Sequence, residues 1–497
     1  MGNNWKVVPL GTLCSKVLTG GTPLTKNKEF YDNGSIPWLK TKEVNFNFIT
    51  ETENFISEKG LKGSSAKLVP INSVIVAMYG QGDTAGRVAI NKIPVTTNQA
   101  CCNLVIDPEK ADYRFIYYYL KDSYVELVRR KTGSAQPNLN TGILKDFEVP
   151  DIELNIQNKV GELLESFDKK INLNQQTNQT LEQMAQTLFK SWFVDFDPVF
   201  DNLLAKVDFK LENLASDFPE VLLKRAQKRL LALDDKVKTA LLSAISSSEV
   251  KSPEETSSEE ASQTNIHQHF PSEFEHNEQL GWIPKGWQAL DILSCSSKIS
   301  KGSTPRKKDI EEATGDVCIP FIKVRDISST GEINISKLDL IPSCVHEKQL
   351  KRSILEENDV LFSIAGTIGR VSLVSSELQG SNANQAVAFI RAKKIEVSLF
   401  LYEFLKTESI QNEVQSKVVQ AVQANVSLGK LGEIALVIPP TKLLERWHES
   451  SFSYLLKSQS LLESNRNLVK LRDTLLPKLI SGELQIPDIK ASNEKTT

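Results

Sequence analysis

The sequence predicts a mixed α/β (α+β) fold in which two similar modules are each followed by a long helix. The first observation is a repeat, because nearly the same motifs occur twice in the same order, about 280 residues apart. The second is that apolar runs punctuated by glycine and proline, typical of strands and turns, alternate with helical stretches in both copies. The third is that each copy ends in a long run whose apolar positions recur every three or four residues.

Length and composition describe a chain of several domains. Its 497 residues exceed what one core usually organises, so we expect about two to four domains. Hydrophobic residues make up 40% of the chain and charged residues 24%, with a formal net charge of −3. No apolar run reaches the ~18 residues that a membrane span needs, and the start of the chain has no apolar signal segment. We therefore expect a cytoplasmic protein that does not bind membranes.

Seven pairs of motifs define the repeat, and their offset drifts only from 282 to 287 residues. They are Trp5 and Trp287, Thr22-Pro23 and Thr304-Pro305, IPWLK from Ile36 and IPFIK from Ile319, AGRVAI from Ala85 and IGRVSL from Ile368, NQA from Asn98 and from Asn384, QPNLN from Gln136 and QANVS from Gln423, and NQTLEQMAQTLFK from Asn178 and NRNLVKLRDTLLP from Asn465. Because both the order and the spacing are kept, the motifs indicate duplication of a whole unit rather than chance similarity.

Each copy begins with a compact module, residues 1–150 (module 1) and residues 287–440 (module 2). The runs NSVIVAMYG, NDVLFSIAG and ACCNLVI predict buried strands followed by turns. The runs ADYRFIYYYLKDSYVELVRRK and SLFLYEFLKTESIQNEVQSK predict helices. The mixture predicts an α/β or α+β core in both modules.

A long helix is predicted after each module, over residues 151–195 and 441–485, with a flexible tail at 486–497. Prolines mark both starts, since a residue before proline disfavours helix. Asn174, Asn178 and Asn465 fall on the apolar seam, where a polar residue costs stability but fixes register. We predict that the helices form an antiparallel coiled coil that relates the modules by a pseudo-two-fold axis.

The stretch 196–286 has no counterpart in the repeat. Its first part, LLAKVDFKLENLASDFPEVLLKRAQKRLLALDDKVKTALLSAI, has a helical pattern, and the acidic, low-complexity stretch after it predicts a disordered linker. This stretch holds 10 basic against 16 acidic residues, whereas residues 1–150 hold 18 basic against 14 acidic ones. His267 and His269 could bind a metal weakly, but no cysteine or acidic cluster accompanies them.

The sequence contains no recognisable catalytic or cofactor motif. There is no Walker A, H-E-x-x-H, G-x-S-x-G or EF-hand pattern, and no C-x-x-C pair that would indicate a zinc ribbon. Gly80, Gly82 and Gly86 are spaced somewhat like a dinucleotide-binding loop. An arginine follows them, however, and the matching AGTIGR keeps only two glycines, so we favour a structural turn.

Two similar modules held apart by stiff helices could read two separated stretches of DNA. A helix of about 40 residues is ~60 Å long, and DNA advances ~34 Å per turn. Because the modules differ in detail, they would read an asymmetric target. Basic residues that could neutralise phosphates or hydrogen-bond guanine edges are present in both modules. Lys40 and Lys323, and Arg87 and Arg370, are favoured because both copies keep the charge.

The chain resembles the specificity subunits of type I restriction-modification systems. The resemblance rests on the Thr-Pro to Ile-Pro spacing of both modules, on the Gly-Arg-Val and Asn-Gln motifs, on LFKSWFVDFDPV from Leu188, and on FPSEFEHNEQLGWIPKGW from Phe270. It covers nearly the whole chain. The segment at about 202–265 departs from the family because it is longer and more acidic than the family needs.

The resemblance implies that each module is a target recognition domain for one half of a bipartite site in double-stranded DNA. It also implies that the helices set the gap and dock two adenine methyltransferase subunits, and that a restriction/translocase subunit can join for phage defence. S-adenosylmethionine, ATP and magnesium would then be bound by the partner subunits. This chain would bind no cofactor or metal and supply no catalytic residue.

Within that framework, residues shared by the two copies are expected to be structural and residues that differ are expected to read bases. The DNA-binding candidates are Lys26, Lys28, Lys40, Lys42, Arg87, Gln136, Asn138, Arg306, Lys307, Lys308, Lys323, Arg325, Arg370, Gln423 and Asn425. Trp192, Phe193 and Phe196 are candidates for subunit docking, with burial in the core as the alternative.

Two other functions stay open at this point. A stand-alone DNA-binding or scaffolding protein would bind its site tightly without a methyltransferase. A self-contained restriction-modification enzyme would methylate DNA by itself, although the missing nucleotide and methyltransferase motifs count against it.

Overall fold

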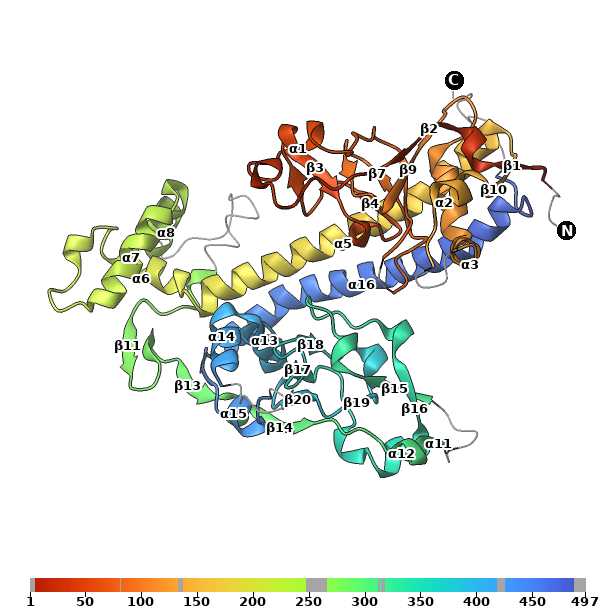
Figure 1. Ribbon diagram of the computed structural model, residues 1–497. Coiled ribbons are helices and arrows are strands. Elements are labelled where there is room, and N and C mark those ends of the chain that lie inside the picture. The colour runs from red at the N-terminus through yellow and green to blue at the C-terminus, as the bar shows by residue number, and fades with distance from the viewer. Residues whose placement is uncertain are drawn as a thin grey trace, which may run out of the picture. The chain divides into compact units, whose positions relative to one another are not determined.

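A computed structural model describes residues 5–80, 82–132, 137–246, 266–311, 313, 318–417 and 425–486 (Figure 1). Its contacts divide the chain into two compact units. Unit 1 comprises Met1–Thr177 and Ser460–Thr497, and unit 2 comprises Asn178–Gln459. Each unit therefore contains one module together with part of both long helices. Within the described residues, no helix is long and apolar enough to cross a membrane.

Module 1 is built on a five-stranded sheet of order β2-β9-β6-β7-β4, with a small sheet β5-β3-β8 and a pair β1-β10. The strands are β1 (Val7–Pro9), β2 (Cys14–Thr19), β3 (Ile36–Leu39), β4 (Asn47–Ile49), β5 (Phe55–Ile56), β6 (Val74–Ala77), β7 (Val88–Asn91), β8 (Thr96–Thr97), β9 (Cys101–Ile106) and β10 (Glu148–Pro150). The helices are α1 (Glu58–Lys62), α2 (Tyr113–Asp122), α3 (Tyr124–Arg129) and α4 (Thr141–Lys145). The central strands β6 and β9 are buried because they are continuous apolar runs, as their sequences predict.

Module 2 repeats this topology, except that its main sheet has four strands and no counterpart of β4 among the described residues. Its sheets have the orders β14-β20-β17-β18, β16-β15-β19 and β13-β21. The strands are β13 (Gln288–Asp291), β14 (Ser296–Lys301), β15 (Cys318–Ile322), β16 (Asp339–Pro342), β17 (Val360–Ser363), β18 (Val371–Leu373), β19 (Asn382–Ala383), β20 (Val387–Ala392) and β21 (Ala435–Ile438). The helices are α10 (Ile292–Cys295), α11 (Lys307–Glu311), α12 (Ser343–Lys348), α13 (Ile395–Lys406), α14 (Glu408–Ser416) and α15 (Leu428–Gly432).

The correspondence extends to irregular features. The register shifts between Cys14 and Lys16 on β2, and between Ser296 and Lys298 on β14. In the small sheets, β3 pairs in parallel with β8, and β15 pairs in parallel with β19. Because a bulge and a parallel pair recur at matching places, the sequence repeat is a repeat of structure. The predicted mixed α/β fold with an internal repeat is confirmed.

Two helices of 40 residues each, α5 (Leu154–Phe193) and α16 (Thr441–Ile480), follow the modules. They lie side by side and antiparallel (Figure 1). In unit 1, the Asn174 Nδ2 atom donates to Asn465 Oδ1 at 2.8 Å, and Asp168 forms an ion pair with Arg472. In unit 2, the Phe189 ring packs edge-on against Trp447. The contacts thus run in opposite directions along the two sequences, which confirms the predicted antiparallel coiled coil.

The hydrogen bond between Asn174 and Asn465 allows the pairing of the two helices to be tested. Replacing Asn174 alone by leucine removes the donor to the buried Asn465 carbonyl oxygen, so we expect the free energy of unfolding to fall by about 1–3 kcal/mol. Replacing both residues by leucine leaves neither of these two amides unsatisfied, so the double variant is expected to be near neutral or more stable. Urea denaturation of the single variant, the double variant and the parent protein measures this. Equal losses in the single and double variants would contradict a paired seam.

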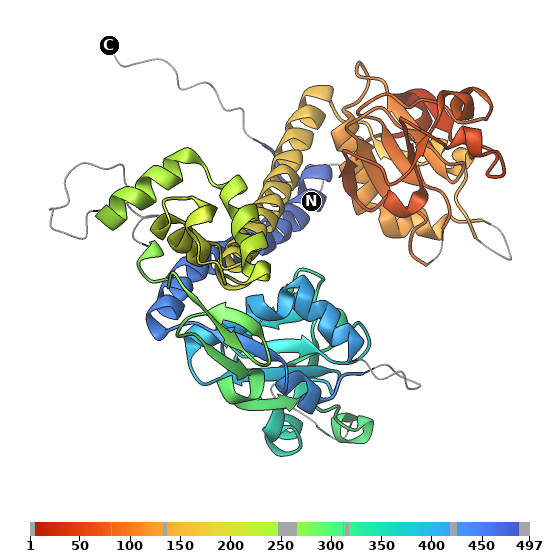
Figure 2. The ribbon, with the colours of Figure 1, turned by 90° about the vertical axis from the view of Figure 1, so that its left-hand side faces the viewer.

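The stretch without a repeat partner forms a helical cluster, α6 (Asp197–Lys206), α7 (Glu220–Ala232) and α8 (Asp235–Ser246), drawn yellow-green in Figure 2. The Arg229 guanidinium pairs with the buried Asp201 carboxylate at 2.7 and 2.8 Å. Arg225 donates to the carbonyl oxygens of Val194 (3.0 Å) and Asp195 (2.6 Å). Arg225 therefore holds the short turn between the end of α5 at Phe193 and the start of α6 at Asp197.

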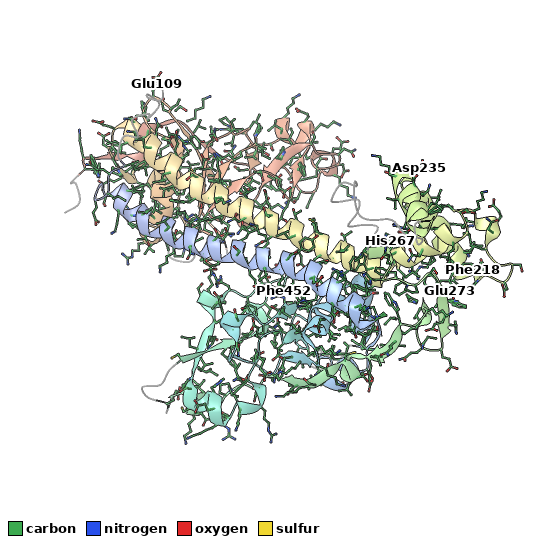
Figure 3. The ribbon with its side chains drawn as sticks, turned by 180° about the vertical axis from the view of Figure 1, so that it is seen from behind. Glu109, Phe218, Asp235, His267, Glu273 and Phe452 are labelled. Atoms are coloured by element: carbon green, nitrogen blue, oxygen red, sulfur yellow. The ribbon has the colours of Figure 1, made fainter. Side chains whose placement is uncertain are left out.

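His267 packs within this cluster. Its Nε2 atom lies 3.2 Å from Asp201 Oδ2, and Figure 3 labels it along with Phe218 and Asp235 of the same stretch. Among the described residues, no group of three or more potential metal ligands occurs. The predicted disordered linker lies mostly at residues 247–265, outside the described residues.

Candidate nucleic-acid interface

The Thr-Pro and Asn-Gln motifs contact each other in both modules. The Thr22 hydroxyl donates to the Gln99 side-chain oxygen, and the Thr304 hydroxyl donates to that of Gln385. The glycine two residues before each threonine allows the two loops to meet. A Cβ atom on Gly20 would lie 2.1 Å from the Asn98 carbonyl oxygen, and one on Gly302 would lie 1.9 Å from that of Ala383. These shared motifs therefore carry framework contacts.

Lys40 and Lys323 directly follow the strands β3 and β15 and make the same backbone contact. The Lys40 backbone N–H donates to Glu43 (2.9 Å) and the Lys323 N–H donates to Asp326 (2.8 Å), so a short helical turn begins after each lysine. The Lys40 ammonium group donates to Asn54 Oδ1 at 3.0 Å, whereas that of Lys323 pairs with Asp339. The hydrogen bond from Lys323 lowers the pKa of the Asp339 carboxyl group, with the charges of Lys323 and Arg325 acting in the same direction.

Arg87 and Arg370 hold the turn that follows each of these lysines. Arg87 donates to the Asn45 side chain at 2.9 Å, and Arg370 donates to the carbonyl oxygens of Val324 (3.1 Å) and Ile327. The glycines before them have positive φ angles, +93° at Gly86 and +95° at Gly369. This conformation favours glycine, and it recurs in both copies, in agreement with a structural turn. Both arginines are partly buried and act within the framework.

The basic residues that differ between modules are more accessible. Lys42 pairs with Glu53, and the corresponding Arg325 pairs with Asp339 at 2.9 Å. The side chains of Lys42 and Arg325 are 62% and 64% exposed, so DNA could reach them. The remaining charged candidates, on the segments after the Thr-Pro motifs, are also exposed: Lys26, Lys28, Arg306, Lys307 and Lys308.

The candidates with amide side chains lie elsewhere in the modules. Asn138 forms a backbone bridge with Thr132, and Asn425 forms one with Ala365. The residues after them, Leu139 and Val426, donate to the carbonyls of Met78 and Ile364. Gln136 and Gln423 lie outside the described residues. The structure thus brings Lys40, Lys42 and Arg87 together around residues 43–54, and brings Lys323, Arg325 and Arg370 together at the matching place in module 2. No contact with DNA is tested, so the site remains a prediction.

Trp192, Phe193 and Phe196 are buried within unit 2, with exposed fractions of 7%, 6% and 6%. Trp192 and Phe193 pack against Trp447, and Phe193 also packs against Phe400 of module 2. These contacts agree with the alternative that the sequence left open, which is burial in the core. Because the side chains are covered by this chain itself, packing is their visible role, and contact with another subunit stays an untested prediction.

Truncating Trp192 to alanine is expected to lower the free energy of unfolding by about 3–5 kcal/mol, as for other large core aromatics. Guanidinium denaturation of the full chain measures this. The matched control is Leu231→Ala, because Leu231 is 89% exposed and should lose less than about 0.5 kcal/mol. A stability unchanged by Trp192→Ala, with weaker binding of a methyltransferase subunit, would favour docking instead.

A polar stripe on α5 was not predicted from the sequence. Gln157, Gly161, Glu165 and Asp168 recur at steps of four, four and three residues and all face module 1. The helical spacing of three polar residues around a glycine was the available signal. This spacing is a weak signal, because polar positions beside an apolar seam usually face solvent.

A family model for the type I restriction modification DNA specificity domain matches residues 2–183 and 285–443. The chain belongs to this specificity-domain family. The two matched segments contain module 1 and module 2, so the internal repeat is a pair of specificity domains.

Two curated relatives match this specificity protein over almost their whole length. The type I restriction enzyme MjaIX specificity subunit of Methanocaldococcus jannaschii is 25% identical over 98% of this chain and 95% of the relative. The type I restriction enzyme HindI specificity subunit of Haemophilus influenzae is 24% identical over 97% of this chain and 100% of the relative. The crystal structure of a type I restriction-modification S subunit from M. genitalium has a TM-score of 0.50 at 16% identity and covers 98% of both chains. That similarity concerns the fold.

Proposed function

We propose that this chain is the non-catalytic DNA sequence-specificity subunit of a type I restriction-modification complex. Each module reads one half of an asymmetric bipartite site in double-stranded DNA. The observation that carries this proposal is the repeat itself. Two modules share their framework contacts, Thr22–Gln99 and Thr304–Gln385, but present different exposed basic residues at matching places, such as Lys42 and Arg325.

The long helices set the gap between the half-sites. Each has 40 residues and is therefore ~60 Å long, which exceeds the ~34 Å of one DNA turn. The same helices dock two methyltransferase subunits, which methylate adenine on opposite strands. These partners supply the binding sites for S-adenosylmethionine, and the restriction/translocase subunits use ATP and magnesium.

Reconstitution tests this function. The full chain is mixed with its methyltransferase partner, and adenine methylation of a random-sequence DNA library is sequenced. We expect methylation at one gapped, asymmetric motif only when both proteins are present. Tight, site-specific binding by this chain without any methyltransferase partner would instead identify a stand-alone DNA-binding protein, and methylation by the chain alone would identify an enzyme.

A further inference from the structure

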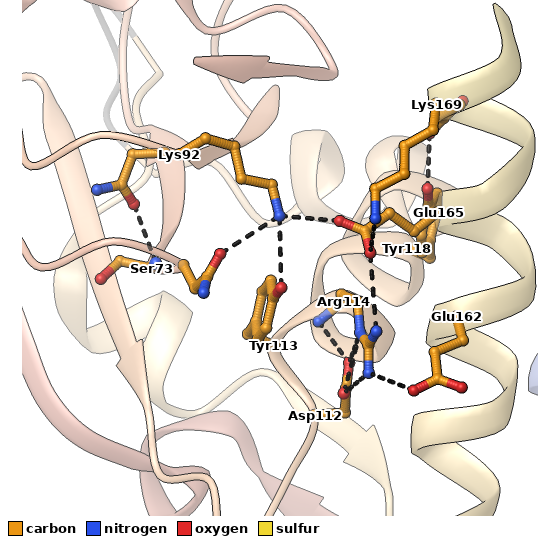
Figure 4. A network of polar contacts seen from close by, with 12 residues as sticks. Ser73, Lys92, Asp112, Tyr113, Arg114, Tyr118, Glu162, Glu165 and Lys169 are labelled. Atoms are coloured by element: carbon orange, nitrogen blue, oxygen red, sulfur yellow. Dashed lines mark hydrogen bonds and ion pairs between the residues drawn. The ribbon is translucent and has the colours of Figure 1, made fainter. Parts of the chain in front are cut away.

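The polar stripe of α5 forms a charge network with module 1 (Figure 4). At its centre, the Glu165 carboxylate accepts a hydrogen bond from Lys92 Nζ at 2.8 Å and lies 3.2 Å from Lys169 Nζ and 3.7 Å from the Arg114 guanidinium. Only 4% of Glu165 is exposed. Lys92 comes from the loop after β7 and Arg114 comes from α2, so a single buried carboxylate joins two elements of module 1 to the long helix.

Neighbouring contacts fix the direction in which module 1 packs against α5. The Arg114 guanidinium is held by Asp112 at 2.7 Å, and Asp112 also caps α2 through the backbone N–H groups of Arg114 and Phe115. The Asp112 backbone N–H donates to Gln157 of α5 at 3.0 Å. A Cβ atom on Gly161 would lie 2.8 Å from the Asp112 carboxylate, so glycine is what permits this close packing. One turn further, Tyr118 donates to Asp168 at 2.7 Å.

The charges of this network favour a role in orienting module 1 on α5 over a role in stabilising the fold. Burial alone would raise the pKa of the Glu165 carboxyl group, but the hydrogen bonds and charges of Lys92 and Lys169 lower it overall. Glu165 is therefore charged and must be paired. Buried ion pairs add little net stability compared with apolar packing, but their geometric demands can select one arrangement. The donors of this network come from a loop and from a helix of module 1. All of them reach the Glu165 carboxylate only when module 1 lies at one angle on α5.

Module 2 is attached differently. Its helix α13 places Phe400 against Phe189 and Phe193 of α5, with ring centroids 5.1 Å apart in both pairs. One ion pair, Lys406–Glu182, accompanies this aromatic core. At the offset of 287 residues that relates α16 to α5, the counterpart of Glu165 is Phe452, which stacks on His448 and is labelled in Figure 3. The buried carboxylate at the centre of the network is thus replaced by an aromatic side chain at the matching position of α16.

We propose that Lys92, Arg114 and Glu165 are positioning residues that hold module 1 at one angle on α5 and thereby make the gap between the two half-sites a single length. This rests on the proposed function. We assign these three residues no contact with a base. Their effect on recognition is to reject DNA whose half-sites have the right sequence but the wrong spacing.

The test uses the full chain in complex with its methyltransferase and the variant Lys92→Gln/Glu165→Gln. The substrates are duplexes that keep both half-sites of the wild-type motif and differ in the gap by one or two base pairs. We expect the preference for the native gap to fall by about tenfold, while base preferences within the half-sites are unchanged. A preference for the native gap as strong as that of the wild type would overturn the proposal.

A matched control removes an ion pair that does not reach α5. Lys59 and Glu29 lie 2.9 Å apart on the surface of module 1, and Lys59→Gln/Glu29→Gln should leave the gap preference unchanged. Tyr118→Phe, which removes only the hydroxyl that bonds Asp168, should lower the preference in the same direction but less. If Lys92→Gln/Glu165→Gln and Tyr118→Phe lost methylation equally at every gap, the residues would be merely structural. If the wild type itself selected no gapped motif, the proposed function would fail and not only this inference.

Discussion

Inserting one helical turn at matching points of α5 and α16 is expected to move methylation to a motif with the same half-sites and a gap one or two base pairs longer. Four residues lengthen a helix by about 6 Å and turn it by about 400°, so the seam returns to within about 40° of its original face. DNA advances ~34 Å over 10–10.5 base pairs, so 6 Å corresponds to nearly two of them. Suitable points are after Gln176 and after Leu462, near the Asn174–Asn465 pair. Sequencing of methylated DNA measures the motif.

Two controls sharpen this result. The same four residues inserted after Ser216, an exposed position between α6 and α7, should leave the gap unchanged. An insertion in α5 alone should impair folding or activity, because it separates the Asn174–Asn465 contact from the Phe189–Trp447 contact. If the matched insertion altered the bases that are read, the helices would not act as a spacer.

Exchanging module 1 for that of a relative is expected to replace one half-site and leave the other half-site and the gap intact. Each module has its own sheets and its own framework contacts, so its surface can change without disturbing the other. The structure adds a condition. The incoming module must keep partners for the α5 stripe, which means counterparts of Lys92, Arg114 and Tyr118.

The reciprocal exchange of module 2 is the matched control and should replace the other half-site only. A donor without counterparts of Lys92 and Arg114 should read its own half-site with a broadened gap. Methylated-DNA sequencing of each chimaera distinguishes these results. Both half-sites changing after either exchange would contradict independent reading by the modules.

The repeat made the fold predictable. Hydrophobic patterns locate β6, β9 and the long helices, and the duplicated motifs reveal that the modules correspond. The seam was also readable, because asparagines spaced with apolar residues indicate a paired coiled coil, and Asn174 does bond Asn465. Asn178 is buried as well, but its amide group forms no hydrogen bond within the described residues.

Long-range polar partners were not predictable from one sequence. Glu53 and Asp339 orient basic candidates from neighbouring segments, and nothing in their local pattern identifies those partners. Glu165 shows the same difficulty, since a charged residue on a helix normally faces solvent and its burial depends on tertiary packing. Trp192 was ambiguous because an aromatic residue on a helix fits a core and a docking surface equally well.

The helical cluster between the modules also exceeded what the sequence indicated. Its helices follow from their apolar spacing, but the role of Arg225 depends on where α7 packs. Only the structure shows that Arg225 donates to the carbonyls of Val194 and Asp195, in the turn that follows α5. This contact gives a structural role to part of the stretch that departs from the family pattern.

A single-molecule methylome of host DNA, recorded with and without this chain while its methyltransferase partner is present, tests the central claim most directly. We predict that removing the chain abolishes adenine methylation at one bipartite, gapped and asymmetric motif, and that restoring it returns methylation at both half-sites. An unchanged methylome would contradict the assignment of this chain as the subunit that selects the sequence.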